Sequence, residues 1–111
     1  MANYLIIGAS SGIGKQLATQ LVESGNRVYG TYNSTEASTT SDSLSYHQLN
    51  VLDESLNLDF LPDTLDGIAY CPGSINLRPF GRITPNDFMD DYNLQVVGAI
   101  KVIQSQFAKL R

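Results

Sequence analysis

The stretch LIIGASSGIGKQLA, residues 5–18, decides the fold of this chain, because it joins an apolar run to an amphipathic run through three glycines. The apolar residues 4–7 are typical of a strand that is buried on both faces. From residue 13 onward apolar residues recur at helical spacing, and the pattern stops at Gly25, a residue type that often ends helices. The stretch therefore predicts a strand, a glycine turn and a helix.

The glycines of this turn fit the binding of a phosphate group at the start of a helix. Main-chain N–H groups and the helix dipole attract a phosphate, whereas side chains would block its approach. Gly8 can turn the chain out of the strand, Gly12 can admit a pyrophosphate, and Gly14 can let the helix pack closely. The triphosphate-binding motif fails, because Ala9 and Gln16 replace its first glycine and its hydroxyl residue. A structural turn without a ligand is the alternative.

The sequence after this turn continues to alternate strand patterns with other segments. Residues 27–32 and 66–71 are expected to be strands, and residues 45–49 a weaker strand. The polar residues 33–43 predict a loop with at most a short helical turn, and a disordered linker is the alternative. Strands that alternate with helices imply an α/β fold with a parallel sheet.

The clearest helix is expected at residues 85–109. Thr84 suits the N-cap, Pro85 the first helical position and Asp87 the position of a reciprocal capping carboxylate. Apolar residues recur every three or four positions, so the face expected to pack is formed by Phe88, Tyr92, Val96, Ala99, Ile103 and Phe107. The side chains expected to meet water are Asp90, Asp91, Lys101 and Gln104.

The composition limits the class of protein. The 111 residues are 42% hydrophobic, which suits one domain, residues 1–111, with a core of its own. The net charge of −4 argues against nucleic acids and anionic membranes as partners. Cys71 is the single cysteine and is expected to be an inert core thiol in a reducing compartment. Neither a signal peptide nor a membrane-spanning run is found, so we expect a cytoplasmic protein.

Several segments, in the right order, resemble the short-chain dehydrogenase/reductase family. The motif G-x-x-x-G-I-G after the first strand looks like the family's cofactor turn, and NVLD at residues 50–53 resembles its D-V-x-D adenine-side segment. YCPG at residues 70–73 stands where the family carries N-N-A-G, and Asn93 falls on the family's active-site asparagine. The residues that depart from the family pattern are Asn50, Tyr70, Cys71 and Pro72. The resemblance covers essentially the whole chain and implies a Rossmann-type three-layer fold with strands 1–4, in the order three, two, one, four.

The resemblance implies a cofactor site and one catalytic residue within this chain. Asn93 is expected to help hold a water relay in the active site; the alternative is an asparagine that satisfies a neighbouring carbonyl or faces solvent. The residues expected to contact the cofactor are Gly8, Ser10, Ser11, Gly12, Ile13, Gly14, Tyr32, Asn33, Ser34, Asn50, Val51, Cys71, Pro72 and Gly73. No metal site is expected.

The end of the second strand predicts NADP(H) rather than NAD(H) as the cofactor. An acidic residue there would bind the ribose hydroxyls of NAD and would repel a 2′-phosphate, and residues 31–34 contain no acid. The basic residue often used for NADP is also absent. The side chains expected to donate hydrogen bonds to the phosphate are Tyr32, Asn33, Ser34 and Ser10.

The family's catalytic serine and Tyr-x-x-x-Lys pair are not found in this order among the 111 residues. Lys101 and Lys109 are expected to be solvated helix charges. His47 is expected to be structural, because no acid or nucleophile is paired with it by spacing. We therefore expect the cofactor-binding, N-terminal half of a dehydrogenase, arising by truncation, as part of a longer chain or as a short cofactor-binding protein. Such a chain alone is expected to be inactive.

For the complete enzyme, the resemblance implies hydride transfer between NADP(H) and a small-molecule carbonyl or alcohol substrate. The alternatives are a noncatalytic dinucleotide-binding module and a scaffold fragment that needs a partner chain. Without a second half, the fourth strand would keep an open edge and the last helix would keep uncovered apolar surface. A homo-oligomer is therefore expected.

Overall fold

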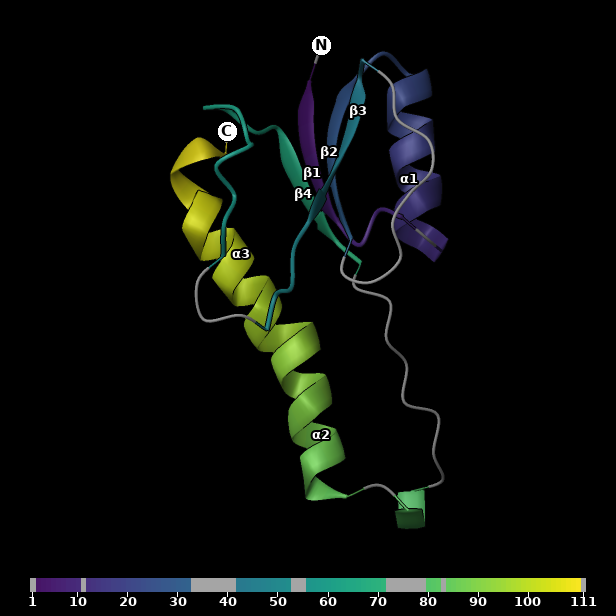
Figure 1. Ribbon diagram of the computed structural model, residues 1–111, viewed down its shortest axis with the longest axis vertical. Coiled ribbons are helices and arrows are strands. Elements are labelled where there is room, and N and C mark those ends of the chain that lie inside the picture. The colour runs from purple at the N-terminus through teal and green to yellow at the C-terminus, as the bar shows by residue number, and fades with distance from the viewer. Residues whose placement is uncertain are drawn as a thin grey trace.

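The computed structural model describes residues 2–10, 12–32, 42–52, 56–71, 80–82 and 84–110, apart from the side chains of Phe80, Phe88 and Asp91. Its four described strands are parallel and lie in the order β3-β2-β1-β4, between helices (Figure 1). Their bounds are Asn3–Ile7 for β1, Arg27–Tyr32 for β2, Leu44–Gln48 for β3 and Gly67–Tyr70 for β4. The sheet confirms the predicted Rossmann-type α/β fold and its strand order.

The predicted strands differ from the observed ones only at their ends. Strand β2 has the predicted bounds, whereas β3 begins and ends one residue earlier and β4 is one residue shorter at each end. Strand β1 also begins one residue earlier, because Asn3 pairs in register with Arg27. Most of the predicted polar loop at residues 33–43 lies outside the described residues.

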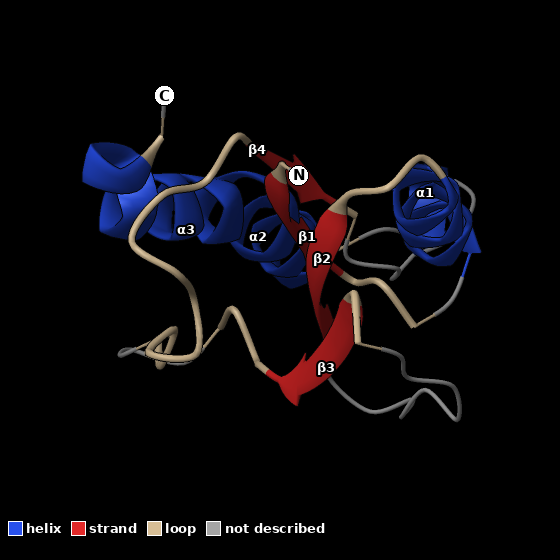
Figure 2. Ribbon diagram, turned by 90° about the horizontal axis from the view of Figure 1, so that it is seen from above, coloured by secondary structure: helices blue, strands red, loops and turns tan. Residues whose placement is uncertain are grey.

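Helices cover both faces of the sheet (Figure 2). Helix α1 (Gly12–Glu23) lies on one face, where Ile6 belongs to a buried cluster. The long C-terminal helix lies on the other face, where Leu5 and Ile7 pack in one cluster with Val102. Successive side chains of β1 thus enter opposite layers, so this strand is buried on both faces as predicted.

The connection from β3 to β4 contains no helix within its described residues. Its segment 56–66 is irregular but supplies buried leucines, namely Leu58, Leu61 and Leu65. Leu65 also forms a parallel bridge with Leu110, just after the long helix. The connection therefore fills the layer beside that helix, on the face opposite α1 (Figure 2).

The last helix covers residues 85–109, as predicted, but it is not α-helical throughout. Its parts are α2 (Pro85–Tyr92), the π-helical turn η2 (Asn93–Val97), α3 (Gly98–Gln106) and the 3₁₀ turn η3 (Phe107–Lys109), and a 3₁₀ turn η1 (Phe80–Arg82) precedes it. The predicted capping box is confirmed. The Thr84 N–H donates to Asp87 Oδ2 over 2.9 Å, and the Asp87 N–H donates to Thr84 Oγ1 over 3.2 Å.

The face of this helix that packs on the sheet is not the predicted one. Among the predicted members, Tyr92, Val96, Ile103 and Phe107 are 52%, 40%, 41% and 70% exposed, whereas Ala99 is half-buried and the Phe88 side chain lies outside the described residues. The residues that pack recur at intervals of four: Leu94, Gly98, Val102 and Gln106.

The π turn keeps the packed residues on one side of the helix. In a regular α-helix each step of four residues drifts by about 40° around the axis, so three steps drift by about 120°. A π turn accommodates about one extra residue and takes back about 100° of this drift. The residues spaced by four therefore line up on one side. The predicted face was wrong because apolar residues occur on both sides of this helix, and their spacing alone does not fix which side packs on the sheet.

Candidate functional site

The turn between β1 and α1 bends at two glycines with positive φ. Gly8 has φ 82° and Gly12 has φ 58°, in a region that residues with a β-carbon rarely adopt. The Gly8 N–H donates to Thr31 Oγ1 over 3.3 Å, and the Ala9 N–H donates to the Thr31 carbonyl over 2.9 Å. Because Thr31 is buried near the end of β2, these bonds fix the turn to the neighbouring strand.

The two glycines in the first turn of α1 have different surroundings among the described residues. A β-carbon on Gly14 would overlap the carbonyl of Gly8, whereas a β-carbon on Gly12 would meet no further described atom within 4 Å. Gly12 and Ile13 are exposed, and the first turn of α1 contains no acidic residue. This turn thus offers main-chain N–H groups and the positive end of the helix dipole to the open side.

The end of β2 lies beside the glycine turn, because Thr31 pairs in register with Ile7. Tyr32, the last residue of the strand, is half-buried, and so is Ser10 in the turn. The other polar residues predicted to contact a cofactor here, Ser11, Asn33 and Ser34, lie outside the described residues.

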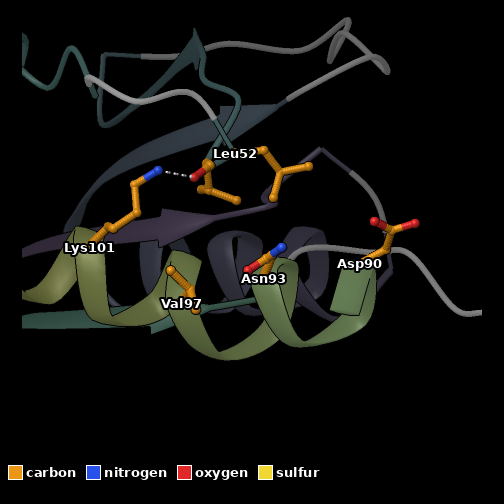
Figure 3. A pocket seen from close by; sticks show the side chains of 6 residues that line it. Leu52, Asp90, Asn93, Val97 and Lys101 are labelled. Carbon is orange, nitrogen blue, oxygen red and sulfur yellow. Dashed lines mark hydrogen bonds between the residues drawn. The ribbon is translucent and has the colours of Figure 1, made fainter. Parts of the chain in front are cut away.

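A tight turn follows β3. Asn50 Oδ1 accepts the N–H of Leu52 over 3.0 Å, which is the geometry of an Asx turn. Val51, between them, is buried in the core. Lys101 Nζ on α3 donates to the carbonyl of Val51 over 2.8 Å (Figure 3). The prediction that Lys101 is a solvated charge was wrong, because the residue is half-buried and its ammonium reaches this carbonyl.

A cavity of about 410 Å³ lies between this turn and the long helix. Its lining residues are Val51, Leu52, Asp90, Asn93, Val97 and Lys101 (Figure 3). The structure therefore brings two predicted site residues, Asn93 and Val51, to one cavity. The other four lining residues were not predicted from the sequence. The four-residue spacing of Asn93, Val97 and Lys101 is the signal that would have grouped three of the six on one helix face.

The end of β4 supplies Tyr70 and Cys71. The Tyr70 hydroxyl donates to the carbonyl of Leu94 in the π turn, and burial raises the pKa of this phenol. The Cys71 N–H donates to the Ile7 carbonyl over 2.8 Å, so it extends the pairing of β4 with β1. Cys71 is a free, half-buried thiol and not the core thiol predicted, because it stands where the strand ends. Pro72 and Gly73 lie outside the described residues.

His47 makes packing contacts on β3. Its ring stacks on Phe60, with centroids 3.8 Å apart and an interplanar angle of 9°. Its Nε2 lies 3.1 Å from Ser45 Oγ, and burial lowers the pKa of the imidazole. Within the described ranges, no three His, Cys, Asp or Glu side chains gather in a way that would hold a metal ion. In the same ranges, no helix is both long enough and apolar enough to cross a membrane.

A parallel sheet of order β3-β2-β1-β4, with a glycine turn that enters α1 from the end of β1, defines a Rossmann-type fold. The family model described as the NAD dependent epimerase/dehydratase family matches residues 4–107, and the chain belongs to this family. None of the curated proteins matches the chain significantly.

Solved structures share the fold. A short chain dehydrogenase family protein from Francisella tularensis subsp. tularensis SCHU S4 gives a TM-score of 0.85 at 22% identity, over 100% of this chain and 47% of that one. The NADPH-bound carbonyl reductase from chicken fatty liver gives 0.84 at 16%, over 98% and 48%. A short chain dehydrogenase from Leptospira borgpetersenii serovar Hardjo-bovis with bound NAD⁺ gives 0.75 at 21%, over 96% and 44%. The chain thus spans about half the length of these structures, and the resemblance to short-chain dehydrogenases/reductases is confirmed.

Proposed function

We propose that this chain is the cofactor-binding part of an NAD(P)-dependent oxidoreductase of the short-chain dehydrogenase/reductase type. The observation that carries the proposal is the space beside Gly12 at the start of α1, where a β-carbon would meet no described atom within 4 Å. This space lies at the carboxyl end of β1, where the chain order of the sheet reverses between β1 and β4. In open parallel sheets ligands bind at such a switch point.

The residues at this place fit a pyrophosphate. The absence of a β-carbon at Gly12 leaves room for an anion, and no acidic side chain in the first turn of α1 would repel it. Ile13 is 78% exposed, so its main-chain N–H is accessible at the same end of the helix. We assign the pyrophosphate to the segment 8–14, with Ser10 and Ser11 as further contacts.

The adenine end of the cofactor is assigned to the turn after β3. Asn50 and Val51 form that turn, and the cavity beside it is large enough for a purine ring. Asn93 lines the same cavity from the long helix. Its role in an active-site water relay is part of the proposal, as are contacts from Cys71, Pro72 and Gly73 after β4.

We propose NADP(H) as the preferred cofactor. The position 20 residues after Gly12, where an NAD-selective fold carries an acid, is Tyr32. An uncharged phenol at this position does not repel a 2′-phosphate, and its hydroxyl can donate a hydrogen bond to one. Asn33 and Ser34 are proposed as further donors.

The chemistry proposed for the whole protein is the reduction of a carbonyl or the oxidation of an alcohol. When bound, the nicotinamide cofactor supplies or accepts the hydride. The acid that must protonate the carbonyl oxygen is a positioned tyrosine in this family, and the sequence holds no Tyr-x-x-x-Lys. We therefore propose that residues 1–111 bind the cofactor but have no turnover by themselves.

The proposal includes assembly with further protein. Residues Tyr92, Val96, Ile103 and Phe107 are exposed, and β4 is an edge strand of the described sheet. An edge strand and an apolar helix face favour association, and we propose a homo-oligomer. The free thiol of Cys71 supports a cytoplasmic location.

Calorimetric titration of the chain with NADPH and with NADH tests the binding function. The proposal expects saturable binding of NADPH, weaker binding of NADH, and no NADPH consumption with aldehydes, ketones or quinones. If neither NADPH nor NADH bound to the chain, the proposed binding function would be refuted. Substrate-dependent NADPH oxidation that copurifies with the intact 111-residue mass would refute the predicted inactivity.

A further inference from the structure

The π turn η2 leaves one helix carbonyl without its usual partner. In an α-helix the Gly98 N–H would donate to the carbonyl of Leu94, four residues earlier. Here it donates to the carbonyl of Asn93 instead. The Leu94 carbonyl is thereby released from the helix, and the hydroxyl of Tyr70 donates to it from the end of β4 (the sheet and the helix lie side by side in Figures 1 and 2).

The packing around this contact leaves little room for another arrangement. A β-carbon on Gly98 would overlap the Tyr70 hydroxyl and would lie 3.1 Å from Cγ2 of Val51. Tyr70 itself is half-buried and packs against the core cluster that contains Val51. Glycine at position 98 therefore lets the phenol reach the helix backbone at the π turn.

We propose that the Tyr70 hydroxyl stabilises the π turn and thereby positions Lys101 on the carbonyl of Val51. Tyr70 is on this account a positioning residue for the turn after β3. The part of the inference that concerns a ligand rests on the proposed dinucleotide function.

The geometry of the helix gives the mechanism. If the Tyr70 hydroxyl were removed, the Leu94 carbonyl would accept the Gly98 N–H in its place. The turn would then return to α-helical spacing. All residues after it would then rotate by about 100° around the helix axis. Lys101 follows the π turn by one helical turn, so its ammonium would leave the Val51 carbonyl. The turn at residues 50–52 would lose the hydrogen bond from Lys101, and the Asn50–Leu52 bond would remain.

The first test uses the ligand-free chain. In the unmodified protein, NMR couplings across hydrogen bonds should connect the Gly98 amide to the Asn93 carbonyl. In Tyr70→Phe the coupling should move to the Leu94 carbonyl, and amide exchange at Val51 and Leu52 should become faster by about fivefold to tenfold. Tyr4→Phe is the matched control, because it removes a hydroxyl from the opposite end of the sheet, and it should change neither. A coupling from Gly98 to Leu94 in the unmodified chain would overturn the proposal even if Tyr70→Phe failed to fold. An unchanged coupling in a folded Tyr70→Phe would overturn it as well.

The second test asks whether Tyr70 acts through Lys101. Binding of adenosine 2′,5′-bisphosphate should weaken about fivefold in Tyr70→Phe and by a similar factor in Lys101→Met. The double variant should lose much less than the product of the two factors, because both changes release the same turn. Losses that multiply would overturn the coupling. If the unmodified chain does not bind the bisphosphate, the proposed site for the adenosine end of NADP(H) fails, and the NMR couplings still decide the role of Tyr70.

Discussion

Gly14 in the first turn of α1 faces the carbonyl of Gly8 at the end of β1 so closely that a β-carbon would overlap it. The third glycine of the turn is therefore required for packing of the helix on the sheet. A β-carbon on Gly12 would meet no described atom within 4 Å, and the φ of Gly12 is 58°, so its requirement is of a different kind. Two glycines that look equivalent in the sequence are thus expected to fail differently when they are replaced.

Replacement of Gly14 is expected to destabilise the fold. Gly14→Ala places a methyl group against main-chain atoms that cannot move aside, and the free energy of unfolding should fall by about 2–3 kcal/mol. Urea denaturation measures this loss. Gly81→Ala is the control, because a β-carbon there meets no described atom within 4 Å, and the expected change is below about 0.5 kcal/mol. Equal stability of the two variants would contradict the packing role.

Much of the fold could be predicted from local signals in the sequence. The glycine turn, the strands β1 and β2 and the capping box of Thr84 and Asp87 each depend on residues that are close in sequence. The features that could not be predicted depend on distant contacts. The hydroxyl of Tyr70 meets the π turn 24 residues later, and Lys101 meets the Val51 carbonyl 50 residues earlier. No helical periodicity contains either contact, so the packed helix face and the role of Lys101 were missed.

The cofactor preference is expected to depend on Tyr32. Tyr32→Asp places a carboxylate where a 2′-phosphate is proposed to bind, and repulsion should weaken NADPH binding by at least about tenfold, equivalent to about 1.4 kcal/mol. Binding of NADH should improve, because the carboxylate accepts hydrogen bonds from the ribose hydroxyls. Calorimetry of both dinucleotides measures the change. Tyr32→Phe is the control, because it removes only the hydroxyl and should keep the preference for NADPH. If Tyr32→Asp left the preference for NADPH unaltered, the 2′-phosphate would lie elsewhere.

Acid is expected to destabilise the chain in part through His47. Burial lowers the pKa of His47 below its ordinary value of 6.5, so the unfolded state binds more protons than the folded state between the two pKa values. The free energy of unfolding should therefore fall as the pH falls below about 6.5 and should continue to fall until the folded-state pKa is passed. His47→Phe keeps an aromatic ring against Phe60 and removes the titration. Urea denaturation at pH 7.5 and at pH 5 measures the free energy of unfolding. This free energy should fall less between the two pH values in His47→Phe than in the unmodified chain. Equal losses in the two proteins would contradict the assignment of the effect to His47.

The exposed side of the long helix is expected to drive self-association. Val96 and Ile103 are 40% and 41% exposed, and their replacement in a Val96→Glu, Ile103→Glu double variant adds charge to this apolar face. Sedimentation should show association of the unmodified chain and a shift of the double variant toward the monomer. Gln104→Glu adds charge at an exposed, polar position of the same helix and should leave association unchanged. A monomeric unmodified chain would contradict this prediction.

The binding of a dinucleotide at the start of α1 is tested most directly by calorimetric titration of NADPH into the unmodified chain and into Gly12→Val. A branched side chain at Gly12 would fill the space proposed for the pyrophosphate, while no described atom lies close enough to clash with its β-carbon. The positive φ should cost about 1–2 kcal/mol of stability, so the variant is expected to remain folded by circular dichroism. We predict saturable binding of NADPH to the unmodified chain and no measurable binding to folded Gly12→Val. An equal affinity of the two proteins for NADPH would contradict the account.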